Sequence, residues 1–122
     1  MKAGDQNKPQ DLAKRTFQFS IAVLHLLEKL SSGQSQKVLS YQLSRSATSI
    51  GANYEESQAS QSKEDFYYKI GICLREARET HYWLRIIQNM DWVKPEEGLE
   101  KIVAESLELV NIFGKIFSGR PK

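Results

Sequence analysis

The sequence contains few of the features that mark secreted or membrane proteins. Its single cysteine, Cys73, excludes an internal disulfide among the 122 residues. No segment approaches the run of roughly 18 apolar residues that a membrane-spanning helix needs. Residues 1–11 are polar and lack the apolar core of a signal peptide. We therefore expect a cytoplasmic protein that makes no membrane contact.

An excess of charge of one sign is also missing. The 17 basic and 15 acidic residues leave a formal net charge of +2, far below that of a dedicated nucleic-acid-binding protein. Hydrophobic residues make up 40% of the chain and aromatic residues 10%, which argues against disorder. A chain of this length can bury a hydrophobic core, so we expect one folded domain.

Glycine and proline are scarce, with seven and three residues respectively, and several stand where helices would begin or end. Proline suits the first turn of a helix, and glycine favours its end. Pro9 and Pro95 therefore predict helix starts, and Gly33 and Gly119 predict helix ends. Combined with the spacing of apolar residues, these signals predict helices over residues 9–31, 35–60, 62–91 and 95–119.

The links between these predicted helices are short, which favours antiparallel neighbours. We therefore predict an all-α fold, an antiparallel up-down-up-down four-helix bundle. Residues 9–119 form its single domain, and residues 1–8 and 120–122 are assigned to flexible tails.

The stretch from Ser62 to Met90 is the longest predicted helix, and Ser62 is suited to cap its first turn. Apolar residues recur along it at steps of four and three, which keeps them on one side. This predicted core line contains Phe66, Ile70, Cys73, Ala77, Thr80, Leu84 and Ile87. A second line places Glu76 and Glu79 among apolar residues, so these two carboxylates need a partner.

The preceding helix offers that partner. When residues 35–60 fold back antiparallel about Gln61, Arg45 comes to lie opposite residue 77, between the two glutamates. An ion pair of this kind fixes the register of two helices. We predict a structural polar clasp formed by Arg45, Asn53, Glu76 and Glu79.

The same long helix carries a basic face. Arg75, Arg78, Tyr82 and Arg85 follow one another at steps of three, four and three, so they share one side. Arginine binds phosphate groups and tyrosine stacks on bases. Residues 1–46 add seven basic residues against three acidic ones. The predicted nucleic-acid-binding residues are Lys14, Arg15, Arg75, Arg78, Tyr82 and Arg85.

The first predicted helix has an unusually wide apolar face. Its two apolar lines are Phe17, Ile21, Leu24 and Leu27, and Phe19, Val23, Leu26 and Leu30. So wide a face indicates contacts on two sides, the second with another molecule. We therefore expect a homo-oligomer in which this face contacts another copy of the chain. The alternative is that a different protein covers it.

Several motifs between residues 45 and 84 match a known pattern. They are Arg45, Ser49-Ile50, Asn53, Glu55, Asp65-Phe66, Lys69, Glu76-Ala77, Glu79-Thr80 and Tyr82-Trp83-Leu84. In these residues the chain resembles the bacterial four helix bundle protein family. Its members include proteins encoded in intervening sequences of 23S rRNA genes, and it is related to the accessory variability protein of diversity-generating retroelements. The resemblance implies four-helix bundles assembled into a homopentameric ring, with a proposed role in binding nucleic acid.

Catalytic arrangements are weakly represented. Di-iron bundles use Glu-x-x-His motifs, but the residues three before His25 and His81 are alanine and arginine. Clustered glutamates resemble the Mg-binding site of a nucleotide pyrophosphohydrolase, which is a remote alternative. The glutamates concerned are Glu55, Glu56, Glu76 and Glu79.

We therefore predict a non-enzymatic homo-oligomeric scaffold, without metal or cofactor, that binds RNA or DNA weakly through its basic face. The alternative is a protein-partner-binding assembly module that makes no contact with nucleic acid.

Overall fold

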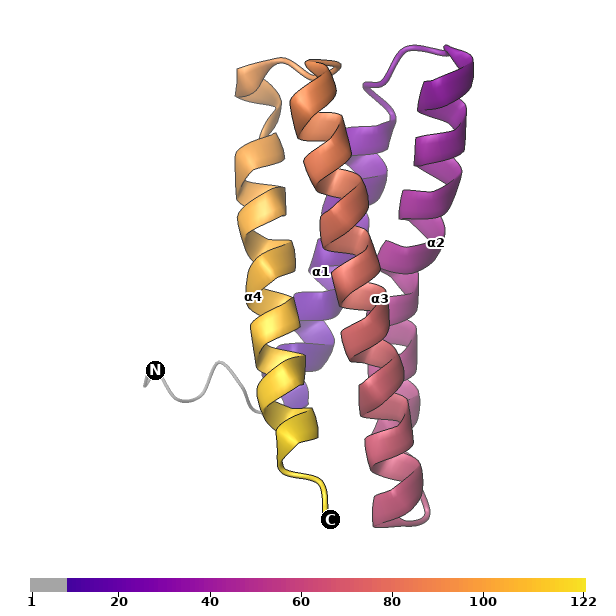
Figure 1. Cartoon of the computed structure of the whole chain (residues 1–122), viewed down its shortest axis with the longest axis vertical. Helices are drawn as coiled ribbons and strands as arrows, with labels where there is room; N and C mark the ends of the chain where they lie inside the picture. The colour runs from indigo at the N-terminus through magenta and orange to yellow at the C-terminus, as the bar shows by residue number, and fades with distance from the viewer. Residues whose placement is uncertain (1–8) are drawn as a thin grey trace.

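A computed structural model describes residues 9–122 and contains four long helices. These are α1 (Pro9–Leu27), α2 (Gln34–Ser57), α3 (Lys63–Met90) and α4 (Leu99–Ser118). They lie side by side, each running opposite to the one before, and short loops join them (Figure 1). The predicted all-α four-helix bundle is confirmed. The tail predicted for residues 1–8 lies outside the described residues.

The four helices are not packed equally. α2 with α3, and α3 with α4, form the most extensive contacts, whereas α1 packs on α2 and only lightly on α4. α1 therefore lies diagonally across the bundle from α3. This arrangement makes α3 the helix around which the others are organised, and it separates the outer surfaces of α1 and α3.

Local chemistry explains where α3 begins and ends. Ser62 adopts an extended backbone, and its side chain accepts a hydrogen bond from the Asp65 N–H at 3.0 Å, as its position before the helix predicts. At the other end Asp91 adopts a left-handed conformation with φ of 56°, which stops the helix. The predicted start and end of this helix are therefore correct to within a residue or two.

Other predicted boundaries differ by a few residues. α1 ends at Leu27 instead of residue 31, because the N–H groups of Lys29 and Leu30 bond to carbonyls only three residues back. Pro95 starts a separate 3-10 helix, η2 (Pro95–Glu97), and α4 begins after Gly98. Gly98 has φ of 83°, a conformation that glycine adopts without strain.

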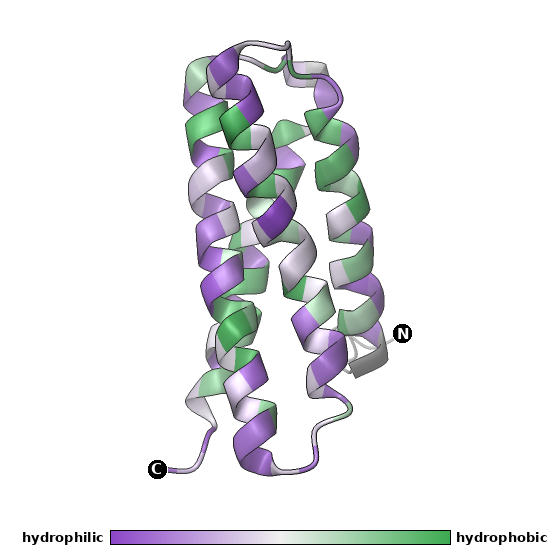
Figure 2. Cartoon of the chain, turned by 90° about the vertical axis from the view of Figure 1, so that its right-hand side faces the viewer, coloured by the Kyte–Doolittle hydropathy of each residue, from purple (hydrophilic) through white to green (hydrophobic). Residues whose placement is uncertain are grey.

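The core lies along the inner sides of the helices. Hydrophobic and hydrophilic residues both occur along each helix, as an amphipathic pattern requires (Figure 2). On α3 the predicted line is buried from Ile70 to Ile87, and on α1 the line through Phe19, Val23 and Leu26 is buried. Burying each large side chain of this kind contributes about 1.5 to 3 kcal/mol.

α1 and α2 approach closely where small residues meet. A Cβ atom added to Gly51 would lie 3.1 Å from Thr16 Oγ1, so glycine leaves room for the α1 side chain. Nearby, the Ser20 hydroxyl donates to the Ala47 carbonyl of α2 at 3.3 Å. A larger side chain at position 51 would push these two helices apart.

Candidate functional site

The predicted basic face on α3 is exposed. Arg75, Arg78 and Arg85 are all exposed, as is Tyr82, and the Arg85 guanidinium lies 5.7 Å from the centre of the Tyr82 ring. Among the described residues, none of these three arginines lies within ion-pair distance of a carboxylate. Three guanidinium groups and an aromatic ring are therefore available to a ligand on one side of α3.

Arg15 has a different environment from the α3 arginines. Its Nε and Nη2 atoms donate to the two Glu105 carboxylate oxygens at 2.5 and 2.8 Å, and Nη2 also donates to Glu108 at 2.7 Å. The hydrogen bond to Glu105 raises the pKa of Arg15 above its ordinary value. A phosphate group would have to displace two carboxylates, so Arg15 serves to join α1 to α4.

Lys14 is exposed on α1 next to Arg15. Because α1 lies diagonally across the bundle from α3, the structure does not bring Lys14 onto the same surface as the α3 arginines. The six residues predicted from sequence thus separate into an exposed face on α3, a paired arginine and a distant lysine.

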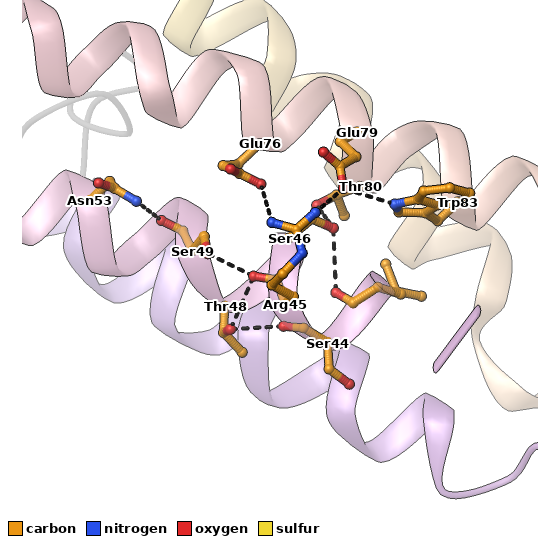
Figure 3. A network of polar contacts seen from close by, with 11 residues as sticks. Ser44, Arg45, Ser46, Thr48, Ser49, Asn53, Glu76, Glu79, Thr80 and Trp83 are labelled. Carbon is orange, nitrogen blue, oxygen red and sulfur yellow. Dashed lines mark hydrogen bonds and ion pairs between the residues drawn. The ribbon is translucent and has the colours of Figure 1, made fainter. Parts of the chain in front are cut away.

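The predicted clasp residues Arg45, Glu76 and Glu79 meet between α2 and α3 (Figure 3). Arg45 Nη1 lies 3.6 Å from Glu76 Oε1, and Nη2 donates to Glu79 Oε2. The indole N–H of Trp83 also donates to Glu79 Oε2, at 3.2 Å. Glu76 is only 8% exposed, so Arg45 supplies the positive charge that a buried carboxylate requires.

Asn53 does not join this cluster. Its side-chain amide donates to the Ser49 carbonyl at 2.8 Å, within its own helix (Figure 3). A second α2–α3 contact is buried instead beside the clasp, where the Thr80 hydroxyl donates to Ser46 Oγ at 2.9 Å. Sequence periodicity placed Thr80 on the core line but gave no signal for Ser46, because serine is common on exposed helix faces.

The sequence also gave no signal for a contact between His81 and Ser106, which lie 2.8 Å apart from Nδ1 to Oγ across α3 and α4. Ser106 Oγ also lies 2.7 Å from the Val103 carbonyl oxygen, so this serine contacts both its own helix and α3. Burial, reinforced by the charge of Arg85, lowers the pKa of His81. Ser106 is fully buried, so this pair holds two helices together.

A family model described as 23S rRNA-intervening sequence protein matches residues 8–114. The chain belongs to this family. The match runs from the start of α1 into α4 and includes both the clasp and the basic face.

A solved structure agrees with membership of the intervening-sequence family. It is a protein of unknown function from the S23 ribosomal protein family of Bacteroides thetaiotaomicron, with 34% sequence identity to this chain and a TM-score of 0.78. The similarity covers 87% of this chain and 97% of that one. No curated protein matches the sequence. Family and fold are therefore established together.

In this family member, three of the four glutamates weighed for magnesium binding have other contacts. Glu76 and Glu79 face Arg45, and Glu56 accepts a hydrogen bond of 2.8 Å from Lys69, which raises the pKa of that lysine. Among the side chains that the structure describes, no three His, Cys, Asp or Glu groups gather closely enough to hold a metal ion. Within the same residues, no helix combines the length and hydropathy needed to cross a membrane.

Proposed function

We propose that this intervening-sequence family member is a non-enzymatic scaffold that associates with copies of itself and binds RNA or DNA weakly. The observation that carries the proposal is the exposed face of α3. There Arg75, Arg78 and Arg85 are grouped with Tyr82 and have no carboxylate partner among the described side chains.

The composition of this face suits a polynucleotide. Guanidinium groups bind phosphate oxygens, and a tyrosine ring stacks on a base of any sequence. Three phosphate contacts on a single strand give a slope of about −2 for the logarithm of affinity against that of salt concentration. One face is therefore weak, and an oligomer that repeats it gains affinity through multivalency.

Self-association is supported by the apolar line of α1 that begins at Phe17. Phe17 is 60% exposed, Ile21 is 42% exposed and Leu24 is 40% exposed, and the three lie on one side of the helix. A row of large exposed hydrophobic residues is typical of a contact surface. We assign this row to the interface of a cytoplasmic homopentamer, the assembly that the family resemblance implies.

A second candidate function uses the same surface differently. Val38 and Tyr41 on α2 are also exposed hydrophobic residues. A different protein that covers α1 and these α2 residues would make the chain an assembly module without nucleic-acid contact.

Light scattering tests these proposals directly. The mass of the protein is measured with and without a short structured RNA at about 50 and 200 mM salt, between which phosphate contacts weaken steeply. We expect a multimer that takes up RNA at the lower salt concentration, and loss of uptake in the R75A/R78A/R85A variant.

A matched control removes three exposed lysines elsewhere, in a K29A/K37A/K101A variant, and is expected to retain RNA binding apart from a small general loss. A multimer indifferent to RNA would overturn the nucleic-acid function and favour a protein partner. A monomer at all concentrations would overturn the self-association.

A further inference from the structure

A groove of about 550 Å³ opens between the first half of α3 and the end of α4. It lies at the end of the bundle where the α2–α3 loop and the C-terminus are found (Figure 1). Its volume is in the range of small-ligand sites. Three cations and three aromatic rings contribute to its lining: Lys63, Arg75, Arg120, Tyr67, Tyr68 and Phe117.

The groove has its form because Gly71 carries no side chain. A Cβ atom added there would lie 3.0 Å from Cε1 of Phe117, so the phenylalanine ring rests against the α3 backbone. Tyr68 and Arg75 stand three residues before and four residues after Gly71, which places them on the same side of the helix. Their side chains therefore border the groove on either side of the point where the Phe117 ring meets α3.

One cation is held in place at the α4 end. The Arg120 guanidinium lies 3.9 Å from the centre of the Phe117 ring, and its Nη1 atom donates to the Phe117 carbonyl at 3.0 Å. Stacking on an aromatic ring fixes the plane of the guanidinium and leaves its other N–H groups free to bind an anion. The cation at this end of the groove is thus preorganised.

The charges of the groove favour an anion. Glu64 is the one carboxylate residue that lines the groove beside Lys63, Arg75 and Arg120. None of these three cations forms an ion pair with a side chain that the structure describes. The aromatic surface favours a flat ring, and Tyr68 is 66% exposed, so its ring is accessible for stacking. A ligand that carries both a phosphate and an aromatic ring matches both features.

We propose that this groove binds a single nucleotide, with its base against Tyr67 and Tyr68 and its phosphate held by Arg75 and Arg120. The site extends beyond the nucleic-acid face proposed above, with which it shares only Arg75. Two sources supply this chemistry, a free nucleotide or an unpaired nucleotide within a single strand.

Calorimetric titration of the full chain distinguishes these sources. The probes are AMP, adenosine, inorganic phosphate and a six-residue oligoadenylate. We expect AMP or the oligonucleotide to bind more tightly than adenosine or phosphate, because only the nucleotides use both halves of the groove. Tyr68→Ala and Arg120→Ala should each weaken that binding about five- to tenfold. Both side chains are exposed, so these variants should melt like the parent protein.

Two variants serve as matched controls, Tyr41→Ala for an exposed tyrosine on α2 and Lys37→Ala for an exposed cation on the same helix. Arg78→Ala is tested beside them because Arg78 belongs to the nucleic-acid face and lies outside the groove. AMP binding that responds to Tyr68→Ala and not to Tyr41→Ala supports a free nucleotide as ligand. If Tyr68→Ala weakens oligoadenylate binding, Tyr41→Ala does not, and AMP does not bind, the ligand is a nucleotide within a single strand.

Three results would overturn the groove proposal. The first is phosphate binding as tight as that of AMP, because the base would then contribute nothing. The second is oligoadenylate binding that responds to Arg78→Ala but to neither groove variant, which would leave the nucleic-acid face of α3 standing by itself. The third is absence of binding by every probe, which would overturn both the groove proposal and the nucleic-acid face of α3.

Discussion

Two sets of charged residues on α3 are adjacent in sequence but differ in environment. Glu76 and Glu79 face α2 and share Arg45, whereas Arg75 and Arg78 are exposed and have no carboxylate partner among the described residues. One step along a helix rotates a side chain by about 100°, so neighbouring residues belong to different faces. This comparison shows that the role of a charged side chain on α3 depends on whether it has an oppositely charged partner. Paired charges hold helices together, and unpaired ones are available to ligands.

The same distinction applies between helices. Arg15 and Arg75 are the same residue type, and both stand on amphipathic helices. Glu105 and Glu108 of α4 bind the first, whereas nothing on the neighbouring helices binds the second within residues 9–122. Arg15 therefore forms structural ion pairs, as Arg45 does.

The largest expected effect comes from breaking the ion pairs that Arg45 forms with Glu76 and Glu79. Arg45→Ala should lower the free energy of unfolding by about 1 to 3 kcal/mol, because it leaves the nearly buried Glu76 carboxylate without a compensating charge. Urea unfolding followed by circular dichroism measures the change. Arg78→Ala is the matched control on the unpaired face. Equal stability of the two variants would show that the clasp does not stabilise the fold.

An effect of comparable size should appear at high pH, because Cys73 is buried with its thiol directed at the Ile50 carbonyl of α2, 3.5 Å away. Burial raises the pKa of the Cys73 thiol to about 12. In the unfolded chain the thiol ionises near pH 8.5 to 9. As the pH rises above about 9, the unfolded state loses this proton first, so stability falls towards pH 12.

Comparison with Cys73→Ala isolates this contribution. Between about pH 8 and 11 the parent protein should lose roughly 2 to 3 kcal/mol more of its unfolding free energy than the variant loses. Urea titrations at both pH values supply the numbers, and the difference removes any constant cost of the substitution. Parallel losses in the two proteins would mean that the thiol ionises equally in the folded and unfolded states.

The smallest expected effect on stability comes from removing the exposed arginines of α3. The R75A/R78A/R85A variant should change the free energy of unfolding by no more than about 0.5 kcal/mol per residue, because exposed side chains without partners contribute little to stability. Thermal melting at low and high salt checks this. A loss as large as that of Arg45→Ala would place these arginines among the structural ion pairs and weaken the proposed ligand face.

Much of this architecture could be predicted from particular residues. Ser62 signalled the start of α3, and the spacing from Ile70 to Ile87 identified its buried side. Folding about Gln61 brought Arg45 to Glu76 and Glu79, because a short loop leaves little freedom of register. The internal bond of Asn53 and the His81–Ser106 contact could not be predicted in this way, since both depend on side-chain geometry that sequence spacing does not specify.

The sequence by itself determined four amphipathic helices and their antiparallel order, because helix periodicity, capping and turn residues act over a few positions. Its motifs between residues 45 and 84 also indicated the family of the chain. Only the tertiary structure decided which charges are neutralised and where a groove forms. Arg15 is bound by residues 90 and 93 positions away, and the recess at Gly71 exists because Phe117 of another helix packs against it. Such contacts depend on how whole helices pack, and no local pattern records them.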